Sequence, residues 1–309
     1  MSALHSALAD YLALRRALGY QLARAEKLLG QFLAFLEASG TEQVSIERAL
    51  TWARQSASAE RSNWPGRRLG VVRGFARYLQ SIGIDAEIPP ADLLPWRRQR
   101  VSPYLYTEPE IRALMVAAQR LRSPLRVATY RTLIGLLAVT GMRVGEAIHL
   151  DREDFDAEQG VLRVRGAKFN KTRELPLHAT TVAALGRYLA RGDRRALYGR
   201  SPALLVSPVG SRLRYCNVHW TFRRLARAVG LQPRTRSCRP RIHDLRHSFA
   251  VRTLIEAYAQ HADTQQRLTV LATYLGHVNP SHTYWYLSAS PELLGQAAAR
   301  LEQHQEGAA

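Results

Sequence analysis

The chain has 309 residues, enough for two domains of ordinary size, and its 46% hydrophobic content excludes wholesale disorder. Its 44 basic and 25 acidic residues give a net charge of +19, which favours a polyanionic partner, most often nucleic acid. Two cysteines without zinc-type spacing argue against a disulfide framework and a structural zinc site, and no apolar run is long enough to cross a bilayer.

The N-terminal part of the chain has the pattern of a small all-helical bundle. Leucine and phenylalanine recur at helical spacing over residues 3–39, where Gly19 is the expected break. Two further helices are predicted over residues 45–55 and 65–82. The first helix is amphipathic and lacks the basic and apolar regions of a signal peptide, so we expect a cytoplasmic protein.

A proline-rich stretch with the basic run WRRQR follows, and we assign residues 93–106 to a linker. Thr107 and Glu110 then form a capping box that opens a second domain. The stretch VLRVRGAKFNKTRELPL, residues 161–177, alternates and turns near its centre, which predicts a β-hairpin. The sequence therefore predicts a mainly α chain with a small β-sheet, with domains over residues 1–92 and 107–309.

In the stretch TGMRVGEA, residues 140–147, an arginine and a glutamate share a helix face. Gly141 permits a turn, and Arg143 and Glu146 stand three residues apart at the start of the predicted helix. A cation among the unpaired N–H groups of a helix start is unfavourable unless an anion also binds there. An anion site and an ordinary surface ion pair both fit this stretch.

The stretch HDLRHSF, residues 243–249, places His243 and Arg246 on one helix face. His243 and His247 have a spacing that can bind a metal, but the HExxH pattern is absent and an arginine stands between them. An arginine and a histidine on one face suit an oxyanion such as phosphate. We expect no metal here and a structural role for His247.

The stretch YLGHVNPSHTYWYL, residues 274–287, contains a further histidine and two candidate tyrosines. Gly276 can end a helix, which leaves His277 in the turn. Tyr284 and Tyr286 lie on the next predicted helix, about 200° apart around its axis, so they cannot both face one site.

Taken in order, TGMR, a lysine-bearing hairpin, HDLRH, LGH and a downstream tyrosine resemble the tyrosine recombinase family. These are site-specific recombinases of the phage-integrase or λ-integrase type, and Xer proteins are among them. The resemblance extends from about Thr107 to Leu294. It implies a C-terminal catalytic domain and a SAM-like helical core-binding domain that clamps DNA.

The resemblance also implies roles for individual residues. Arg143 and Arg246 correspond to the phosphate clamp, and Glu146 to the acidic residue that supports the first arginine. His243 and His277 take the two histidine positions, and the sequence leaves open which of them is the dominant base. Tyr286 stands nine residues after His277, the family's spacing for the nucleophile, and Tyr284 is the alternative.

The hairpin lysines are notable because the chain otherwise uses arginine. Only three of its 44 basic residues are lysines, and two of them, Lys168 and Lys171, lie in this hairpin. Arginine cannot give up a proton near neutral pH, whereas the pKa of a lysine falls beside other cations. The family pattern favours Lys168 as the general acid and leaves Lys171 as a DNA contact, although Phe169 replaces the usual glycine.

A second set of arginines lies on the predicted helix RRLGVVRGFARYL, residues 67–79. We expect Arg67, Arg68, Arg73 and Arg77 to contact DNA phosphates, the alternative being a solvated helix face. The tail SPELLGQAAARLEQ, residues 290–303, is amphipathic. In the family such a segment docks on a neighbouring protomer, which implies a homotetramer on DNA, the alternative being packing within its own chain.

The resemblance implies an enzyme that cleaves and rejoins double-stranded DNA through a 3′-phosphotyrosine, without metal, ATP or another cofactor. A type IB topoisomerase and a non-catalytic DNA-binding accessory protein are the alternatives. A metal-dependent nuclease is disfavoured because no acidic cluster accompanies the histidines. We expect a bacterial, nucleoid-associated protein. Its target site, its biological role and any accessory protein or second recombinase stay open.

Overall fold

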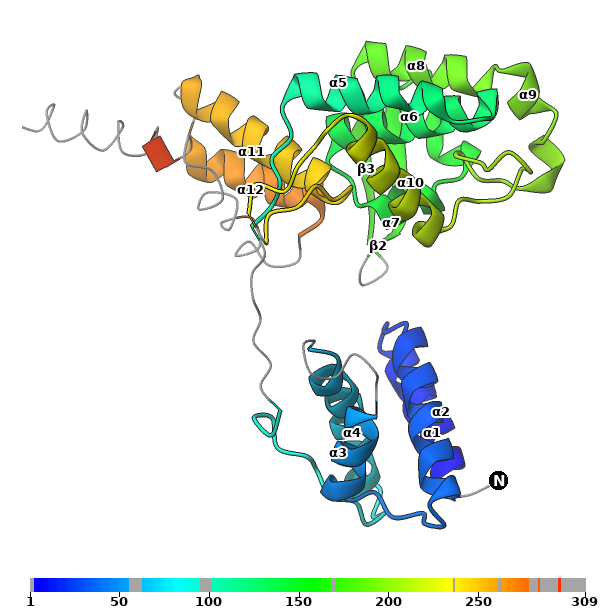
Figure 1. Cartoon of the computed structure of the whole chain (residues 1–309), viewed down its shortest axis with the longest axis vertical. Coiled ribbons are helices and arrows are strands. Elements are labelled where there is room, and N and C mark those ends of the chain that lie inside the picture. Colours follow the sequence, from blue (N-terminus) through cyan, green and yellow to red (C-terminus); the bar gives the residue numbers. More distant parts are fainter. Residues whose placement is uncertain are drawn as a thin grey trace, which may run out of the picture. The chain divides into compact units, whose positions relative to one another are not determined.

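The computed structural model describes residues 3–55, 63–94, 102–167, 171–235, 237–260 and 263–277, together with Thr283 and residues 294–295. The chain divides into two compact units, residues 1–100 and 101–309 (Figure 1). Within the described residues, no helix is both long enough and apolar enough to span a membrane.

The first unit is helical, as predicted. Its helices are α1 (Ala3–Ala17), α2 (Ala23–Ala38), α3 (Ile46–Arg54) and α4 (Trp64–Ser81). The break between α1 and α2 falls at Gly19, which adopts a positive φ of 85° that suits glycine. Phe32, Trp52 and Phe75 are among the buried side chains that form one core between these helices.

The second unit combines helices with a small sheet. Its longer elements are α5 (Glu108–Ala117), α6 (Pro124–Thr140), α7 (Val144–His149), β1 (Phe155–Asp156), β2 (Val161–Ala167), β3 (Lys171–Pro176), α8 (Ala179–Leu189), α10 (Tyr215–Ala228), α11 (Asp244–Ala259) and α12 (Thr264–Leu275). Its short helices are η2 (Ala118–Arg120), η3 (Arg152–Asp154), α9 (Gly192–Arg195) and η4 (Tyr198–Arg200). The sheet has the order β1-β2-β3 with antiparallel neighbours, so the predicted hairpin is confirmed.

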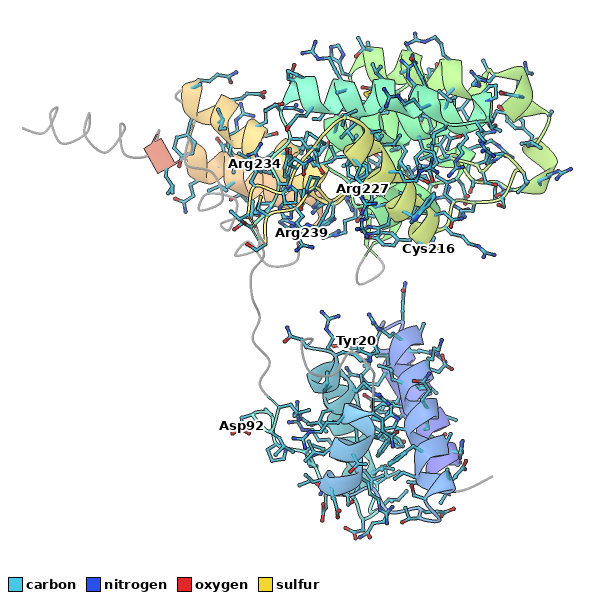
Figure 2. The ribbon with its side chains drawn as sticks, viewed as in Figure 1. Tyr20, Asp92, Cys216, Arg227, Arg234 and Arg239 are labelled. Carbon is cyan, nitrogen blue, oxygen red and sulfur yellow. The ribbon has the colours of Figure 1, made fainter. Side chains whose placement is uncertain are left out.

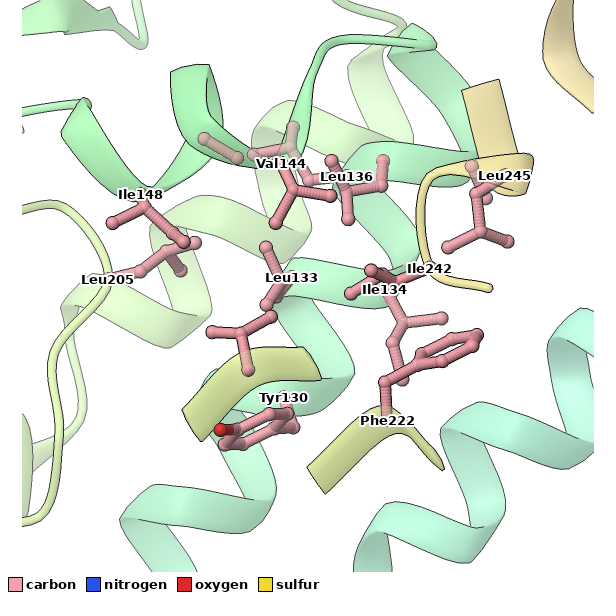
Figure 3. Close-up of a cluster of buried hydrophobic side chains, with 14 of the residues drawn as sticks. Tyr130, Leu133, Ile134, Leu136, Val144, Ile148, Leu205, Phe222, Ile242 and Leu245 are labelled. Atoms are coloured by element: carbon pink, nitrogen blue, oxygen red, sulfur yellow. The ribbon is translucent and has the colours of Figure 1, made fainter. Parts of the chain in front are cut away.

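Helix α6 runs through the core of the second unit. Its residues Leu133, Ile134 and Leu136 are buried among side chains from α7, α10 and α11 (Figure 3). The periodic pattern alone indicates a start near Arg131, but the helix begins at Pro124. Ser123 caps it by accepting a hydrogen bond from the backbone N–H of Arg126, and proline suits the first turn.

The end of the predicted linker belongs to the second unit. Tyr104 and Tyr106 are 3% and 6% exposed and form part of its core. Their rings lie 4.8 Å apart, and burial of such large aromatic surfaces outweighs the linker-like composition around them. The assignment of residues 93–106 to a linker is therefore wrong at its C-terminal end.

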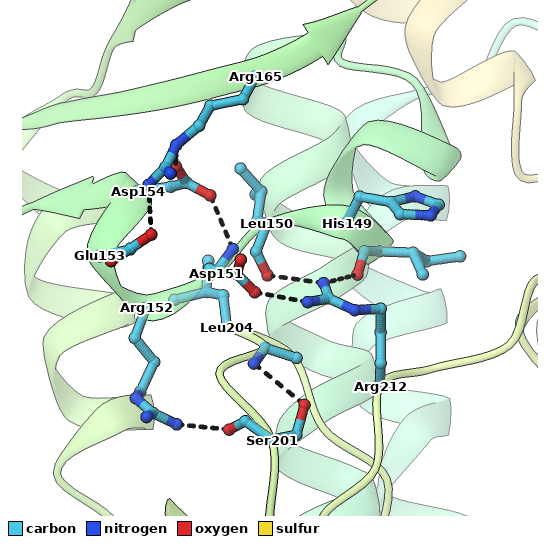
Figure 4. Close-up of polar contacts among 12 residues, drawn as sticks. His149, Leu150, Asp151, Arg152, Glu153, Asp154, Arg165, Ser201, Leu204 and Arg212 are labelled. Atoms are coloured by element: carbon cyan, nitrogen blue, oxygen red, sulfur yellow. Dashed lines mark hydrogen bonds and ion pairs between the residues drawn. The ribbon is translucent and has the colours of Figure 1, made fainter. Parts of the chain in front are cut away.

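A polar network holds the C-terminal end of α7 (Figure 4). Arg212 donates to the carbonyl oxygens of Ile148 and Leu150 at 2.8 and 3.2 Å, and pairs with Asp151 at 2.5 Å. These carbonyls have no partner within the helix, so the arginine both caps the helix and opposes its dipole. The short helix that begins beside Arg143 is thereby fixed at its far end.

Candidate active site

A buried carboxylate joins two arginines at the start of α7. The Glu146 side chain is 9% exposed; its Oε1 accepts from Arg143 Nη1 at 2.7 Å and its Oε2 from Arg173 Nη2 at 2.8 Å. Oε2 also accepts the backbone N–H of Arg143 at 2.8 Å. Burial alone would raise the pKa of Glu146, but hydrogen bonds and charge from Arg173 and Arg143 lower it to about 2. Glu146 is thus ionised at neutral pH and holds Arg143, whose side chain stays 34% exposed.

Three arginines bind the C-terminal end of α12, which stops at Gly276 with a φ of 68°. The carbonyl oxygens of Tyr274, Leu275 and Gly276 accept hydrogen bonds from Arg173 (3.0 Å), Arg246 (2.8 Å) and Arg143 (3.4 Å), respectively. Carbonyls at a helix end lack helical partners and lie at the negative end of the dipole. The end of α12 therefore gathers arginines from β3, α11 and the start of α7.

Arg246 is held by the backbone on two sides. It is 3% exposed, and its Nη1 donates to the Gly141 carbonyl at 2.9 Å. Its Nη2 lies 2.9 Å from His277 Nε2. Gly141 has a φ of 59°, and a Cβ there would overlap the Phe249 ring, so both the backbone and the packing require glycine. The predicted turn at Gly141 is confirmed.

Two histidines occupy the start of α11. Their rings, from His243 and His247, meet edge to face with centroids 5.4 Å apart. Burial, followed by the charges of Arg246 and Arg143, lowers the pKa of His243 to about 4. Burial, followed by the neighbouring His243, lowers the pKa of His247 to about 3. Both imidazoles are neutral at pH 7, so His243 can accept a proton there.

The buried Asp244 anchors this helix start. It accepts hydrogen bonds from the backbone N–H of Tyr104 at 3.2 Å and from Arg241 Nε at 3.0 Å. Ser248 similarly accepts the backbone N–H of Tyr106 at 2.7 Å. Burial raises the pKa of Asp244, although Arg241 opposes this shift. The sequence alone did not single out Asp244, whose role depends on contacts with a segment 140 residues away.

The structure thus brings together five of the residues expected from the sequence. Arg143 and Glu146 come from the start of α7, His243 and Arg246 from the start of α11, and His277 from the turn after α12. His277 Nδ1 lies 2.7 Å from Thr283 Oγ1, which extends the cluster to the following segment. This arrangement places a neutral imidazole beside two guanidinium groups, a combination suited to binding and processing an oxyanion.

Comparisons with known proteins identify the family. Residues 105–292 match the sequence model of the phage integrase family. A putative integrase/recombinase of Sinorhizobium fredii, y4rB, is 44% identical over 312 residues, covering 99% of each chain. The chain belongs to the phage integrase family. The tyrosine recombinase XerD of Xanthomonas campestris pv. campestris is 32% identical, covering 84% of this chain and 78% of the relative.

Solved structures of phage integrase and Xer proteins share the fold. XerH bound to the palindromic difH substrate gives a TM-score of 0.61 at 20% identity, covering 90% of this chain and 78% of XerH. Residues 75–356 of λ integrase, as a dimer bound to a COC′ core site, give 0.60 at 18% identity, covering 91% and 94%. The predicted fold class, mainly helical with a small sheet, is confirmed.

Several residues expected from the family pattern lie outside the described residues. These are Lys168, Tyr284, Tyr286 and nearly all of the tail segment 290–303. Lys171 is the first residue of β3, where it pairs with Ala167 across the hairpin. The roles proposed for these residues rest on the sequence.

The arginines predicted on α4 differ in their surroundings. Arg68 is 8% exposed, and its guanidinium lies 3.7 Å from the centre of the Trp52 ring. Arg73 donates to the carbonyl oxygens of Pro89 and Pro90, both at 2.6 Å. Arg67 and Arg77 are exposed. On this helix the DNA-contact proposal is therefore best placed on Arg67 and Arg77, while Arg68 and Arg73 hold the unit together.

A basic surface on α10 was not singled out from the sequence. Between Asp193 and Asp244 the chain has twelve arginines and no acidic residue. The exposed residues of α10 include Trp220, 56% exposed, with the Arg224 guanidinium 4.7 Å from its ring centre. Arg227 lies on α10, and Arg239 lies in the segment between α10 and α11 (Figure 2). The absence of acidic residues was a signal that the sequence already contained.

Proposed function

We propose that the protein is a site-specific DNA recombinase that cleaves and rejoins strands through a covalent 3′-phosphotyrosine. The convergence of Arg143, His243, Arg246 and His277 in one cluster is the observation that carries this proposal. A phosphodiester carries negative charge that shields phosphorus from attack. Two guanidinium groups offset that charge and stabilise the further charge that develops in the transition state.

Each strand cleavage exchanges one phosphate ester for another. Tyr286 attacks phosphorus in line and forms a P–O bond, while the bond from phosphorus to the 5′ oxygen breaks. His243, neutral at pH 7, accepts the tyrosine proton, and Lys168 protonates the departing 5′ oxygen. His277 Nε2 accepts from Arg246 Nη2, so His277 contacts the phosphate only after that bond is exchanged for one to a phosphate oxygen. A free 5′-hydroxyl then attacks the phosphotyrosine and restores the diester, so the reaction requires neither ATP nor a metal.

Double-stranded DNA is the partner that this proposal requires. The XerH and λ integrase neighbours are bound to their difH and core-site DNA, which supports a similar complex here. A net charge of +19 and the arginines of α10 supply the matching positive surface. A λ integrase tetramer bound to a Holliday junction is a further neighbour, with a TM-score of 0.59. It supports a tetramer on DNA, which we propose to be linked by residues 290–303.

Covalent trapping tests the proposed chemistry. The wild-type protein first selects a binding sequence from a randomised duplex pool, and that sequence is then built as a nicked duplex. Wild type, Tyr286→Phe and Tyr284→Phe are incubated with it in EDTA and resolved on a denaturing gel. We expect a protein–DNA adduct with wild type and Tyr284→Phe, and none with Tyr286→Phe.

The other outcomes are equally informative. Loss of the adduct only in Tyr284→Phe would move the nucleophile to that residue. An adduct that never transfers to a second duplex, combined with relaxation of supercoiled DNA, would identify a topoisomerase. Tight binding without any adduct would contradict the catalytic proposal in favour of an accessory DNA-binding protein.

A further inference from the structure

Arg173 is the side chain that connects the first catalytic arginine to the end of α12. It lies on β3 and is 13% exposed. Its Nη1 and Nη2 donate to the two carboxylate oxygens of Glu146 at 3.2 and 2.8 Å. Its Nε donates to the carbonyl oxygen of Tyr274 at 3.0 Å. One guanidinium therefore links β3, α7 and α12 through three hydrogen bonds.

The acceptors around residue 173 match the donors of an arginine side chain. The fork of two Nη groups matches a carboxylate, while Nε remains to reach a carbonyl, a geometry that lysine cannot reproduce. Gly276 lies directly against it, and a Cβ there would stand only 3.0 Å from Arg173 Nη1. The left-handed glycine that ends α12 thus also makes room for this side chain.

The charges explain why a second arginine is needed. The Glu146 side chain is only 9% exposed and accepts hydrogen bonds from both Arg143 and Arg173. With Arg143 as its sole partner, the carboxylate would neutralise the cation that the phosphate requires. With Arg173 present, the group of three retains a net charge of +1, and Arg143 keeps attraction for an anion while Glu146 still fixes its position.

We propose that Arg173 is a positioning residue for the phosphate site, which acts on Arg143 through Glu146. The inference rests on the proposed strand-transfer function and deepens it. Arg173 itself does not touch the DNA phosphate. Its replacement displaces and electrostatically weakens Arg143 without removing any group that touches DNA.

The test compares Arg173→Gln and Arg173→Lys with wild type on the nicked duplex used for trapping. Arg163→Gln is the matched control, because Arg163 lies on the same hairpin but forms an exposed ion pair with Glu174. We expect Arg173→Gln to slow adduct formation about 100-fold, as misplacement of a catalytic group by roughly 1 Å does. DNA affinity should change little, the thermal midpoint should fall because Glu146 loses a partner, and Arg163→Gln should react like wild type.

A double-variant cycle separates positioning from a general structural role. If Arg173 acts through Glu146, the double variant Arg173→Gln/Glu146→Gln should react no more slowly than Glu146→Gln alone. The inference would be overturned if the two substitutions slowed adduct formation by factors that multiply in the double variant. It would also be overturned if Arg173→Gln reacted as fast as Arg163→Gln. Should Arg173→Gln fail to fold, Arg173→Lys provides the test, because it keeps the charge and loses the fork.

Titration with inorganic phosphate keeps this inference separate from the catalytic proposal. Binding is followed without DNA through the Nε–H signals of ¹⁵N-labelled arginine. If wild type forms no adduct, the proposed function fails, but Arg173→Gln should still bind phosphate about tenfold more weakly, as loss of an effective neighbouring charge implies. Equal phosphate affinity in wild type and Arg173→Gln would refute the positioning role.

Discussion

At the scale of single residues, the site depends on groups whose charge is set by burial and by neighbouring arginines. Glu146 is held ionised and His243 and His247 are held neutral, so the cluster contains fixed cations with an uncharged imidazole beside them. His247 contacts the His243 ring and lies 4.0 Å from Asp244. The structural role expected for His247 has a consequence for stability.

The free energy of unfolding should fall as the pH drops below 6.5, the ordinary pKa of histidine. Below this pH His247 of the unfolded chain binds a proton, whereas His247 of the folded protein stays neutral down to about pH 3. The contribution of neutral His247 to the free energy of unfolding is fully present above pH 6.5. We expect His247→Gln to reduce the slope of unfolding free energy against pH, between pH 6.5 and 5, by about one proton. Urea unfolding at several pH values measures this.

His149→Gln is the control for the pH prediction, since His149 is exposed in the same unit. Asp244, whose pKa is raised, contributes a slope of its own, but it is present in every protein compared. An unchanged slope in His247→Gln would show that folding does not lower the pKa of this imidazole.

At the scale of elements, α10 has two different faces. Val218, Phe222 and Leu225 are buried in the core, which fixes the orientation of the helix. Arg223, Arg224 and Arg227 are exposed on its other side. A helix anchored by apolar residues and displaying arginines is suited to contact a phosphate backbone.

We expect Arg223→Gln/Arg227→Gln to weaken DNA binding and to reduce the slope of log affinity against log salt by about two, one for each phosphate that an arginine no longer neutralises. Fluorescence anisotropy with a labelled duplex over a range of salt concentrations measures both quantities. Arg187→Gln on α8 is the control, because Figure 1 shows α8 and α10 on different sides of α6. An unchanged slope in the double variant would exclude α10 from the DNA interface.

At the scale of the whole molecule, each unit has its own hydrophobic core. The core around Phe32 and Trp52 draws on the first unit, and the core around α6 draws on the second. Residues 1–100 carry 14 basic and 9 acidic side chains, net +5, and residues 101–309 carry 30 and 16, net +14. Most of the positive charge therefore belongs to the second unit.

A fragment of residues 101–309 should fold by itself, because its buried core is complete without the first unit. We expect a single cooperative unfolding transition by circular dichroism and retained DNA binding that is at least about tenfold weaker than that of the full chain. The fragment 107–309 is the comparison, since it removes Tyr104 and Tyr106 from the core. Equal stability of the two fragments would contradict the placement of this segment in the second unit.

Much of the fold follows from local patterns in the sequence. The break at Gly19, the capping box at Thr107 and the hairpin over residues 161–177 depend on residues close together in the chain. The start of α6 and the packing of Tyr104 and Tyr106 do not follow from apolar periodicity, because that pattern contains no information on a serine–proline cap or on a core formed by distant residues.

The sequence by itself determined the family and the set of residues expected at the site, because ordered motifs with fixed spacing are written along the chain. Only the tertiary structure decided how Arg143, Arg173 and Arg246 share the carbonyls at the end of α12. It also showed that Arg68 packs on Trp52 and that Arg73 binds carbonyls of the segment that follows α4. In a chain with 41 arginines among 44 basic residues, residue type cannot separate a phosphate ligand from a structural cation. That distinction depends on burial and on partners that folding brings together from distant parts of the chain.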